Sequence, residues 1–320
     1  MIILYLIGSL LFILFDYSFI ALSLVILYIG AYSILFYFAI FLILIVAFMP
    51  LMTLAERYLL ASIHRRIGPY LLSLFIPFND GLKLILKAII LPLEANTLLF
   101  LIAPLLSFLL ALTQWLFLLL DPSILLFLAF SSLSLYAILL AGWSANSKYA
   151  LLGSLRSIAQ MISYSIALTL LFLAFIFIAG SLNYRPIAFN LFIFILFIIA
   201  LIIALAETNR APFDLPEAES ELVAGFLTEH SALPFTMLYF AEYLNIFTIS
   251  YLFALLFAID FLILLFILFW LRASIPRLKT NTTLLLGWID LLPLLIPLLL
   301  GIPLLLVYTL QFPLLLHRSS

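Results

Sequence analysis

Apolar side chains fill long stretches of this chain, and polar positions interrupt them at only a few places. A helix needs about 20 apolar residues to cross the hydrocarbon layer of a membrane. The apolar stretches are much longer than the ~10-residue strands of an outer-membrane barrel, and they do not alternate with polar positions. The pattern therefore predicts eight membrane-spanning helices. They are expected near residues 31–54, 98–120, 123–142, 158–180, 187–206, 233–248, 250–271 and 286–310.

Residues 1–30 are also apolar, but the polar run Asp16, Tyr17 and Ser18 interrupts them. We expect an N-terminal extension here, either a ninth, tilted helix or a segment lying on the membrane surface. It has no basic start and no small-residue cleavage site, so a cleaved signal is not expected. Residues 31–310 are predicted to form one polytopic membrane domain, followed by a tail at 311–320.

Composition agrees with an all-α integral membrane protein, because hydrophobic side chains make up 68% of the 320 residues and charged ones 8%, against about 25% in soluble domains. Cysteine is absent, which excludes disulfides, thiolate catalysis and Cys-ligated metal centres in this chain. The ten glycines never form G-x-G, so no dinucleotide-binding loop is predicted. The three histidines are too scattered to predict a metal site. A net charge of -1 gives no reason to expect nucleic acid.

The charged residues are concentrated on one side of the predicted membrane domain. All but Arg185 and Arg318 of the thirteen basic residues lie in the connections 55–97, 143–157, 207–232 and 272–285, which alternate spans place on one face. Most of the fourteen acidic residues share these connections. The positive-inside rule assigns that face to the cytoplasm or the mitochondrial matrix. It is interpreted as a docking surface, although short loops on the opposite face would produce some of this asymmetry.

The first long loop contains a second helical pattern. Asp80, Lys83 and Lys87 recur at helical spacing, and leucines and isoleucines between 82 and 90 fill the opposite side. This pattern predicts an amphipathic helix lying flat at the membrane surface. It is either a structural brace or a wall of an entry portal for a lipid-like substrate.

The third loop, 204–230, is the most acidic part of the chain. Asp214 and Glu217 have the spacing of a helix N-cap and its capping-box acid, while Glu217 and Glu221 would share one helix face. Neighbouring carboxylates in an apolar environment can exchange protons near neutral pH. The cluster therefore predicts either proton handling, or helix capping together with ion pairs to Arg210 or to arginines of the first loop.

Three further acids fall inside predicted spans, where a carboxylate is costly enough to indicate function. Glu242 and Asp260 are expected near span centres. Asp290 lies a few residues into its span, so its side chain is expected to reach the membrane surface.

Five segments of the chain are distinctive: ERYLLASIHRRIGPY (56–70), NSKYALLGSLRSIAQMISY (146–164), AETNRAPFDLPEAESELVAGF (206–226), AEYLNI (241–246) and RASIPRLK (272–279). Together they resemble one family, subunit 1 of NADH dehydrogenase, the membrane heel subunit of respiratory complex I. The resemblance runs in order over about residues 31–310, and the acidic block is its most specific part.

This resemblance implies eight core helices and a chamber, shared with peripheral-arm subunits, in which ubiquinone is reduced as the substrate. Iron–sulfur clusters, flavin and NADH would belong to partner subunits, no cofactor would be bound covalently here, and the chain would not be catalytic alone. Small membrane subunits and lipids are the other expected partners. The chamber residues implied are Arg57, His64, Arg66, Asp80, Lys83, Arg210, Asp214, Arg272 and Arg277. The implied acidic path to the proton-translocating subunits is Glu207, Glu217, Glu219, Glu221, Glu229 and Glu242.

The chain departs from the family pattern at positions that concern the implied quinone chamber and the implied acidic path. His64 replaces a usual glutamine but can still donate a hydrogen bond. Ala88 and Ser165 replace usual glutamates, and Ser165 matters most because a hydroxyl does not titrate near neutral pH. We expect another acid, with Asp260 as the candidate, or a bound water to replace the missing carboxylate.

The resemblance places the protein in the mitochondrial inner membrane with its charged loops in the matrix, and a bacterial plasma membrane is the second choice. Two alternatives remain open at this point. A heel subunit of a plastoquinone-, ferredoxin- or hydrogenase-linked complex would keep the architecture with different partners. A free-standing transporter would work without peripheral subunits.

Overall fold

The computed structural model describes residues 47–69, 75–117, 123–181, 191–214 and 224–301. The chain divides into two units, Met1–Leu51 and Met52–Ser320, and nearly all of the described elements belong to the second. The first described helix runs over residues 47–63, and its residues 52–63 belong to the second unit. The other helices of this unit are α3 (Ile76–Leu86), α4 (Thr97–Phe117), α5 (Ser123–Ser144), α6 (Lys148–Ala179), α7 (Leu191–Glu207), η2 (Gly225–Leu227), α9 (Ala232–Phe257), α10 (Phe261–Ser274), α11 (Thr280–Leu285) and the π-helical η3 (Leu286–Leu291). Beyond η3 the chain stays helical to residue 301.

The all-α class is confirmed, since the described residues contain helices and no strand. Within the described ranges, five helices are long and apolar enough to cross a membrane: Thr97–Trp115, Ser123–Ser144, Lys148–Ala179, Ala232–Phe257 and Thr280–Gly301. α7 and α10 are apolar but shorter. Most of the predicted span at 31–54 lies outside the described residues, as do the predicted N-terminal extension and the C-terminal tail.

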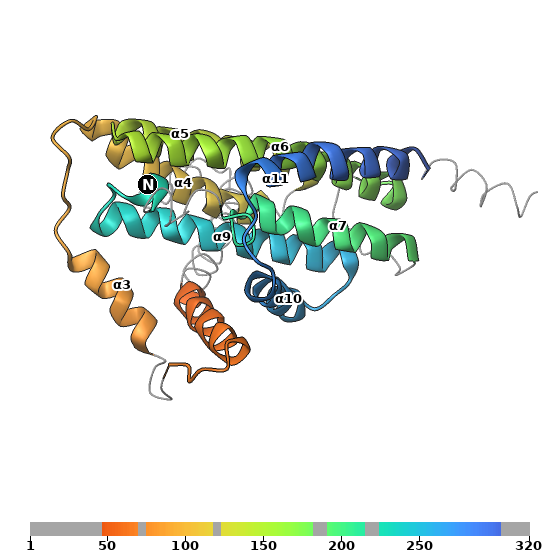
Figure 1. Ribbon diagram of the computed structural model, residues 1–320, viewed down its shortest axis with the longest axis horizontal. Helices are drawn as coiled ribbons and strands as arrows, with labels where there is room; N and C mark the ends of the chain where they lie inside the picture. Colours follow the sequence, from red (N-terminus) through yellow and green to blue (C-terminus); the bar gives the residue numbers. More distant parts are fainter. Residues whose placement is uncertain (1–46, 70–74, 118–122, 182–190, 215–223, 302–320) are drawn as a thin grey trace, which may run out of the picture. The chain divides into compact units, whose positions relative to one another are not determined.

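The five helices α4, α5, α6, α7 and α9 run along one another (Figure 1), and their contacts form the centre of the second unit. Gly142 near the end of α5 lies against Ser154 near the start of α6, so closely that a β-carbon at Gly142 would collide with the serine side chain. Small residues permit this approach between membrane helices. Further along, the core is aromatic and aliphatic, with Phe127, Phe172 and Phe253 buried against one another.

α6 begins at Lys148, ten residues before the predicted start of its span. Ser147 explains the difference, because its hydroxyl accepts a hydrogen bond from the Ala150 N–H, at 3.3 Å, and so caps the helix. At the other end, Gly180 adopts a left-handed conformation and its N–H bonds to the Ile176 carbonyl at 2.8 Å. The predicted second loop is therefore mainly helix.

The expected position of Asp260 near a span centre is wrong. α9 continues to Phe257, where Ala258 in a left-handed conformation ends it, and Asp260 is the exposed residue at which α10 begins. Asp260 is the only charged residue in the surrounding apolar run, and one charge is too small an interruption for a hydropathy pattern to show this turn. Asp290 is also exposed, in the π-helical segment.

The helix before the first loop reaches residue 63, beyond the predicted boundary at 54. Residues 56–63 contain neither glycine nor proline, and Gly68 and Pro69 come only after it ends. Glu56 and Arg57 therefore lie on a helix. The amphipathic pattern of the first loop does form a helix, α3, whose Ile76, Leu82, Ile85 and Leu86 side chains are exposed.

Candidate functional site

An ion pair between Arg210 and Glu242 lies at the centre of the candidate site. The Arg210 Nε atom is 3.0 Å from Glu242 Oε1, and the two side chains are only 7% and 19% exposed. Arg210 follows the end of α7, while Glu242 lies on α9. The guanidinium also lies over the ring of Tyr243, 4.5 Å from its centroid. A cation held by both a carboxylate and an aromatic face is well placed in a low-dielectric region.

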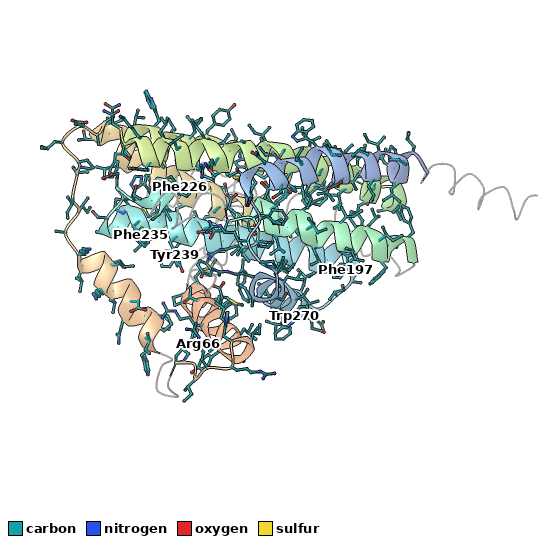
Figure 2. The ribbon with its side chains drawn as sticks, in the orientation of Figure 1. Arg66, Phe197, Phe226, Phe235, Tyr239 and Trp270 are labelled. Carbon is teal, nitrogen blue, oxygen red and sulfur yellow. The ribbon has the colours of Figure 1, made fainter. Side chains whose placement is uncertain are left out.

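Tyr243 connects this pair to a second one. Its hydroxyl donates a hydrogen bond of 2.6 Å to Glu56 Oε2, and Glu56 forms an ion pair with Arg272 near the end of α10. Tyr239, one turn earlier on α9, is within hydrogen-bond distance of the Tyr243 hydroxyl at 3.1 Å and stacks on Phe235 (Figure 2). Three elements far apart in sequence thus meet in one place.

We call Glu56, Arg210, Glu242, Tyr243 and Arg272 the charged cluster. It contains two carboxylates and two guanidiniums, so its formal charges cancel. Burying charges is costly unless each is paired, and the observed pairing meets this condition. A neutral cluster of this kind can respond to a new charge nearby by exchanging partners.

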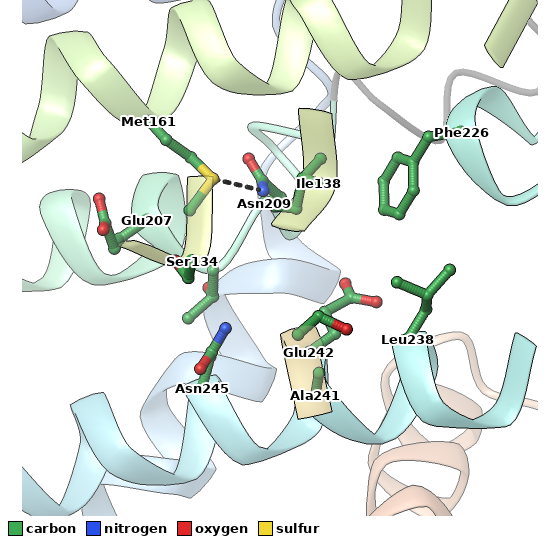
Figure 3. Close-up of a pocket in the computed structure, with 12 residues that line it drawn as sticks. Ser134, Ile138, Met161, Glu207, Asn209, Phe226, Leu238, Ala241, Glu242 and Asn245 are labelled. Atoms are coloured by element: carbon green, nitrogen blue, oxygen red, sulfur yellow. Dashed lines mark hydrogen bonds between the residues drawn. The ribbon is translucent and has the colours of Figure 1, made fainter. Parts of the chain in front are cut away.

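A pocket opens beside Glu242 between α4, α5, α6, α7 and α9, with an empty volume of about 590 Å³ including its mouth. Glu207, the last residue of α7, lies on its far wall, and Asn245 lies between Glu207 and Glu242 (Figure 3). We call this space the Glu207 pocket. Its lining residues are Ser107, Ser134, Ile138, Met161, Glu207, Thr208, Asn209, Phe226, Leu238, Ala241, Glu242 and Asn245.

Glu207 is 6% exposed, and its Oε2 atom has no hydrogen-bond partner among the described residues. Side chains of α6 contact the backbone and side chains around Glu207. The Gln160 side-chain amide donates to the Ala206 carbonyl at 2.8 Å, and the Asn209 amide lies 3.4 Å from the Met161 sulfur. A buried carboxylate on the wall of a pocket that also contains amide and hydroxyl groups is suited to exchange a proton with a molecule bound there.

The third and fourth loops are joined by Asp214 and Arg277. The Arg277 guanidinium forms an ion pair with the Asp214 carboxylate at 3.6 Å and donates to the Asp214 carbonyl. The Leu278 N–H also bonds to the Pro212 carbonyl at 3.0 Å. These contacts place the segment that follows α10 beside the segment that follows α7.

The first loop contributes a more exposed pair. Arg57 and Asp80 are 3.3 Å apart and about half exposed, so this pair joins the helix at 52–63 to α3 without burial. His64, Arg66 and Lys83 are exposed. Arg66 lies beyond the last turn of its helix, which ends at residue 63 (Figure 2). The structure therefore brings Arg210, Glu242 and Arg272 together and leaves the first-loop residues at the surface.

Glu217, Glu219 and Glu221 lie outside the described residues, and Glu229 is half-buried. Beside Glu229, His230 is 5% exposed and stacks on Phe100 of α4, with ring centroids 4.1 Å apart. Burial lowers the pKa of His230 to about 4. Among the described residues, no group of three or more His, Cys, Asp or Glu side chains is arranged to hold a metal ion.

Three residues of the site, Glu56, Tyr243 and Asn245, were not indicated by the sequence pattern. Tyr243 is adjacent to Glu242, and Asn245 follows one turn later on the same helix. Amides and hydroxyls at helical spacing from Glu242 are the signal that would have indicated Asn245. Glu56 had no such signal, because its partners lie on α9 and α10.

Comparison with known proteins gives consistent matches over most of the chain. The family model described as NADH dehydrogenase matches residues 35–302. NADH-ubiquinone oxidoreductase chain 1 of Hyaloraphidium curvatum is 54% identical over 272 residues, covering 79% of this chain and 92% of the relative. The protein of the same name from Chondrus crispus is 42% identical over 284 residues, covering 76% and 87%. An NADH-quinone oxidoreductase subunit of the bacterium Rhodospirillum rubrum is 39% identical over 284 residues, covering 76% and 84%.

Proposed function

Because this chain belongs to the NADH dehydrogenase family, as subunit 1 of an NADH:quinone oxidoreductase, we propose that its charged cluster faces the quinone-reduction chamber and that Glu242 begins a proton path through Glu207. One observation carries this proposal: Glu242 belongs both to the charged cluster and to the wall of the Glu207 pocket. A change of charge at the cluster therefore acts on the first acid of the path.

Reduction of a quinone to a quinol takes two electrons and two protons. The electrons come from an iron–sulfur cluster of a partner subunit, and the negative charge that develops on the quinone oxygens attracts the guanidiniums of this chain. When a guanidinium turns toward that charge, its carboxylate partner loses a cation and its affinity for a proton rises. Glu242 takes part in such an exchange through Arg210. Glu242 and Glu207 then pass either the proton or the change of charge further into the membrane.

The remaining chamber residues lie in the loops and helix ends on the charged face of the membrane domain. Arg57, Asp80, Asp214 and Arg277 form two ion pairs of that face, and His64, Arg66 and Lys83 belong to the same proposed surface. Peripheral-arm subunits dock there and complete the chamber. Glu217, Glu219, Glu221 and Glu229 connect that surface to Glu207.

The isoprenoid tail of ubiquinone enters from the bilayer past α3, whose exposed Leu82, Ile85 and Leu86 match an apolar chain. The membrane is the mitochondrial inner membrane, and the charged loops face the matrix. The eukaryotic relatives and the positive-inside rule support this placement. Flavin, NADH and the iron–sulfur clusters reside in partner subunits.

The test is made on the complete complex in sealed membranes with the variants Glu242→Gln and Glu207→Gln. Each should lower NADH:quinone reductase activity and proton translocation several-fold, while NADH oxidation by ferricyanide, which does not need the quinone chamber, stays unchanged. Glu94→Gln, at an exposed acid outside the proposed path, is the matched control. Full quinone reductase activity and proton translocation in both variants would contradict the proposed path.

A further inference from the structure

The span Thr280–Gly301 is the least buried of the spans in the described ranges. Only 17% of its apolar window is buried within the chain, against 33–72% in the other four spans. Its buried residues form one narrow stripe, in which Thr283, Gly287, Leu291 and Leu295 follow one another at intervals of four. The first part of this stripe packs on α6 (Figure 1). The described residues therefore leave the other sides of this span uncovered.

The contacts with α6 show how the span is placed along its neighbour. The Tyr164 hydroxyl donates a hydrogen bond of 2.8 Å to the Thr283 carbonyl. A β-carbon on Gly287 would lie 3.7 Å from the Ser163 hydroxyl and 3.7 Å from the Tyr164 ring. Asp290 follows Gly287 in the π-helical segment η3 and is exposed. It lies beyond these contacts, further from the end of the span that joins the charged loops.

Asp290 lies near the middle of the span. A helix rises 1.5 Å per residue, so this carboxylate is about 15 Å along the axis from Thr280 and about the same distance from Gly301. The hydrocarbon layer is about 30 Å thick. The sequence pattern predicted a start near 286 and hence a side chain close to the membrane surface, but the helix begins at Thr280. A short aspartate side chain does not reach the surface from this depth.

No partner for this carboxylate is found nearby. Among the described residues, none forms an ion pair or a hydrogen bond with Asp290. The preceding basic residue, Lys279, comes before the helix begins, and the next in sequence is Arg318. Residues 1–46 contain no lysine, arginine or histidine. A carboxylate at this depth is costly unless a cation or a hydrogen-bond donor accompanies it.

We propose that the exposed surface around Asp290 is the docking site for a transmembrane helix of another subunit, and that this helix carries a lysine or arginine that pairs with Asp290. Charge complementarity selects this occupant, because lipid chains could cover the apolar residues but leave the carboxylate unpaired. Polar pairs of this kind join membrane helices. The inference does not use the proposed proton path.

Two further observations support an interface at this place. Trp288, Ile289 and Leu294 are about half exposed around the carboxylate, so a helix packed there would keep the ion pair away from lipid and water. The turn that carries Asp290 is π-helical. Such turns are rare in helices and are frequently found at functional sites.

The first test identifies the neighbour in the assembled complex. The chain has no cysteine, so Leu294→Cys introduces a single thiol one turn after Asp290, and a benzophenone maleimide attached to it is photocrosslinked in intact membranes. Mass spectrometry of crosslinks that contain this chain should show one transmembrane segment of another subunit, with a lysine or arginine inside its apolar run. Leu133→Cys, at an exposed position midway along α5, is the matched control and should not give that crosslink.

The second test measures the charge pair. Asp290→Asn should lower the amount of the crosslinked subunit retained in the detergent-solubilised complex several-fold, whereas Asp290→Glu should retain most of it. Asp260→Asn, which removes an exposed acid at the start of α10, is the control and should change nothing. Asp290→Lys combined with aspartate at the partner's basic position should restore retention, which a purely structural role of Asp290 would not explain.

Four results would overturn the docking site. They are crosslinks from Leu294→Cys to lipid or to this chain alone, a crosslinked segment without a basic residue, full retention in Asp290→Asn, and failure of the exchanged pair to restore retention. The same crosslink from Leu133→Cys would likewise reject this location.

Discussion

Among the residues of the site, burial separates ion pairs that look alike in sequence. Arg210–Glu242 and Arg57–Asp80 each join an arginine to a carboxylate at about hydrogen-bond distance, but the first pair is largely buried and the second is half-exposed. A surface pair contributes little to stability because water and salt screen it. Removing one partner of a buried pair is costly because the other charge stays in a low-dielectric region.

This difference predicts that Arg210→Gln destabilises the subunit by about 3–5 kcal/mol, whereas Arg57→Gln costs about 1 kcal/mol or less. Both losses of stability are measured from the melting temperature of the subunit in the solubilised complex, which is monitored by protease protection. Arg57→Gln serves as the matched control. Equal effects of the two substitutions would mean that burial of the Arg210–Glu242 pair contributes nothing.

His230 gives a prediction for pH. Its imidazole is buried against Phe100 and its pKa is lowered to about 4, so between pH 6.5 and 4 the unfolded chain binds a proton that the folded chain excludes. The free energy of unfolding therefore falls as pH is lowered through this window, by roughly 3 kcal/mol in all. The variant His230→Phe keeps the stacked ring without the titration, and melting at pH 7, 5.5 and 4.5 should show a smaller loss than in the wild type. An equal loss of stability at low pH in the variant and the wild type would contradict the assignment of this pH dependence to His230.

At the scale of helices, the sequence predicted the class and order of the elements better than their ends. Apolar runs of span length located α4, α5 and α6 because hydrocarbon thickness sets the length of a spanning helix. The same signal failed at Asp260, where α9 and α10 meet within one apolar run, and at Ser147, where a single cap starts α6 early. Side-chain pairs between distant elements, such as Glu56 with Arg272, leave no periodic signal.

Close contact between elements also limits which residues they can contain. A β-carbon on Gly153 of α6 would lie 2.8 Å from the α-carbon of Gly225 and 2.9 Å from the Phe226 nitrogen in η2. Gly153→Ala should therefore destabilise the fold by about 1–3 kcal/mol, because backbone must move.

Gly81→Ala is the matched control for that substitution. No atom lies within 4 Å of the added carbon on Gly81, and alanine is the better helix former by up to about 1 kcal/mol. The melting temperature should fall in Gly153→Ala and rise in Gly81→Ala. A neutral Gly153→Ala would show that η2 does not pack tightly on α6.

At the scale of the whole molecule, the structure joins two systems that the sequence presents separately. The family resemblance implied a chamber at the charged loop residues and an acidic path through Glu207 and Glu242, and the structure adds that Glu242 belongs both to the charged cluster and to the wall of the Glu207 pocket. Glu217, Glu219 and Glu221 lie outside the described residues, so their part in the path remains a prediction from sequence. Ser165 does not line the Glu207 pocket, so the proposed path does not depend on it.

It follows that Ser165→Glu should leave the number of protons translocated per NADH unchanged. The new carboxylate would lie on a half-exposed part of α6, outside the Glu207 pocket. Proton translocation by sealed vesicles, measured together with NADH oxidation, gives this ratio. A higher ratio in Ser165→Glu would mean that the path of the wild-type protein has a gap at this position.

We propose that this chain works as the quinone-site membrane subunit of an NADH:quinone oxidoreductase. The most direct test of this claim is a native gel of mildly solubilised membranes, stained for NADH dehydrogenase activity, in which mass spectrometry identifies the chains of the active band. We predict that this chain lies in that band and that a quinone-site inhibitor blocks NADH oxidation in the same membranes. Migration of the chain alone, or with ferredoxin- or hydrogenase-linked partners, would contradict this claim.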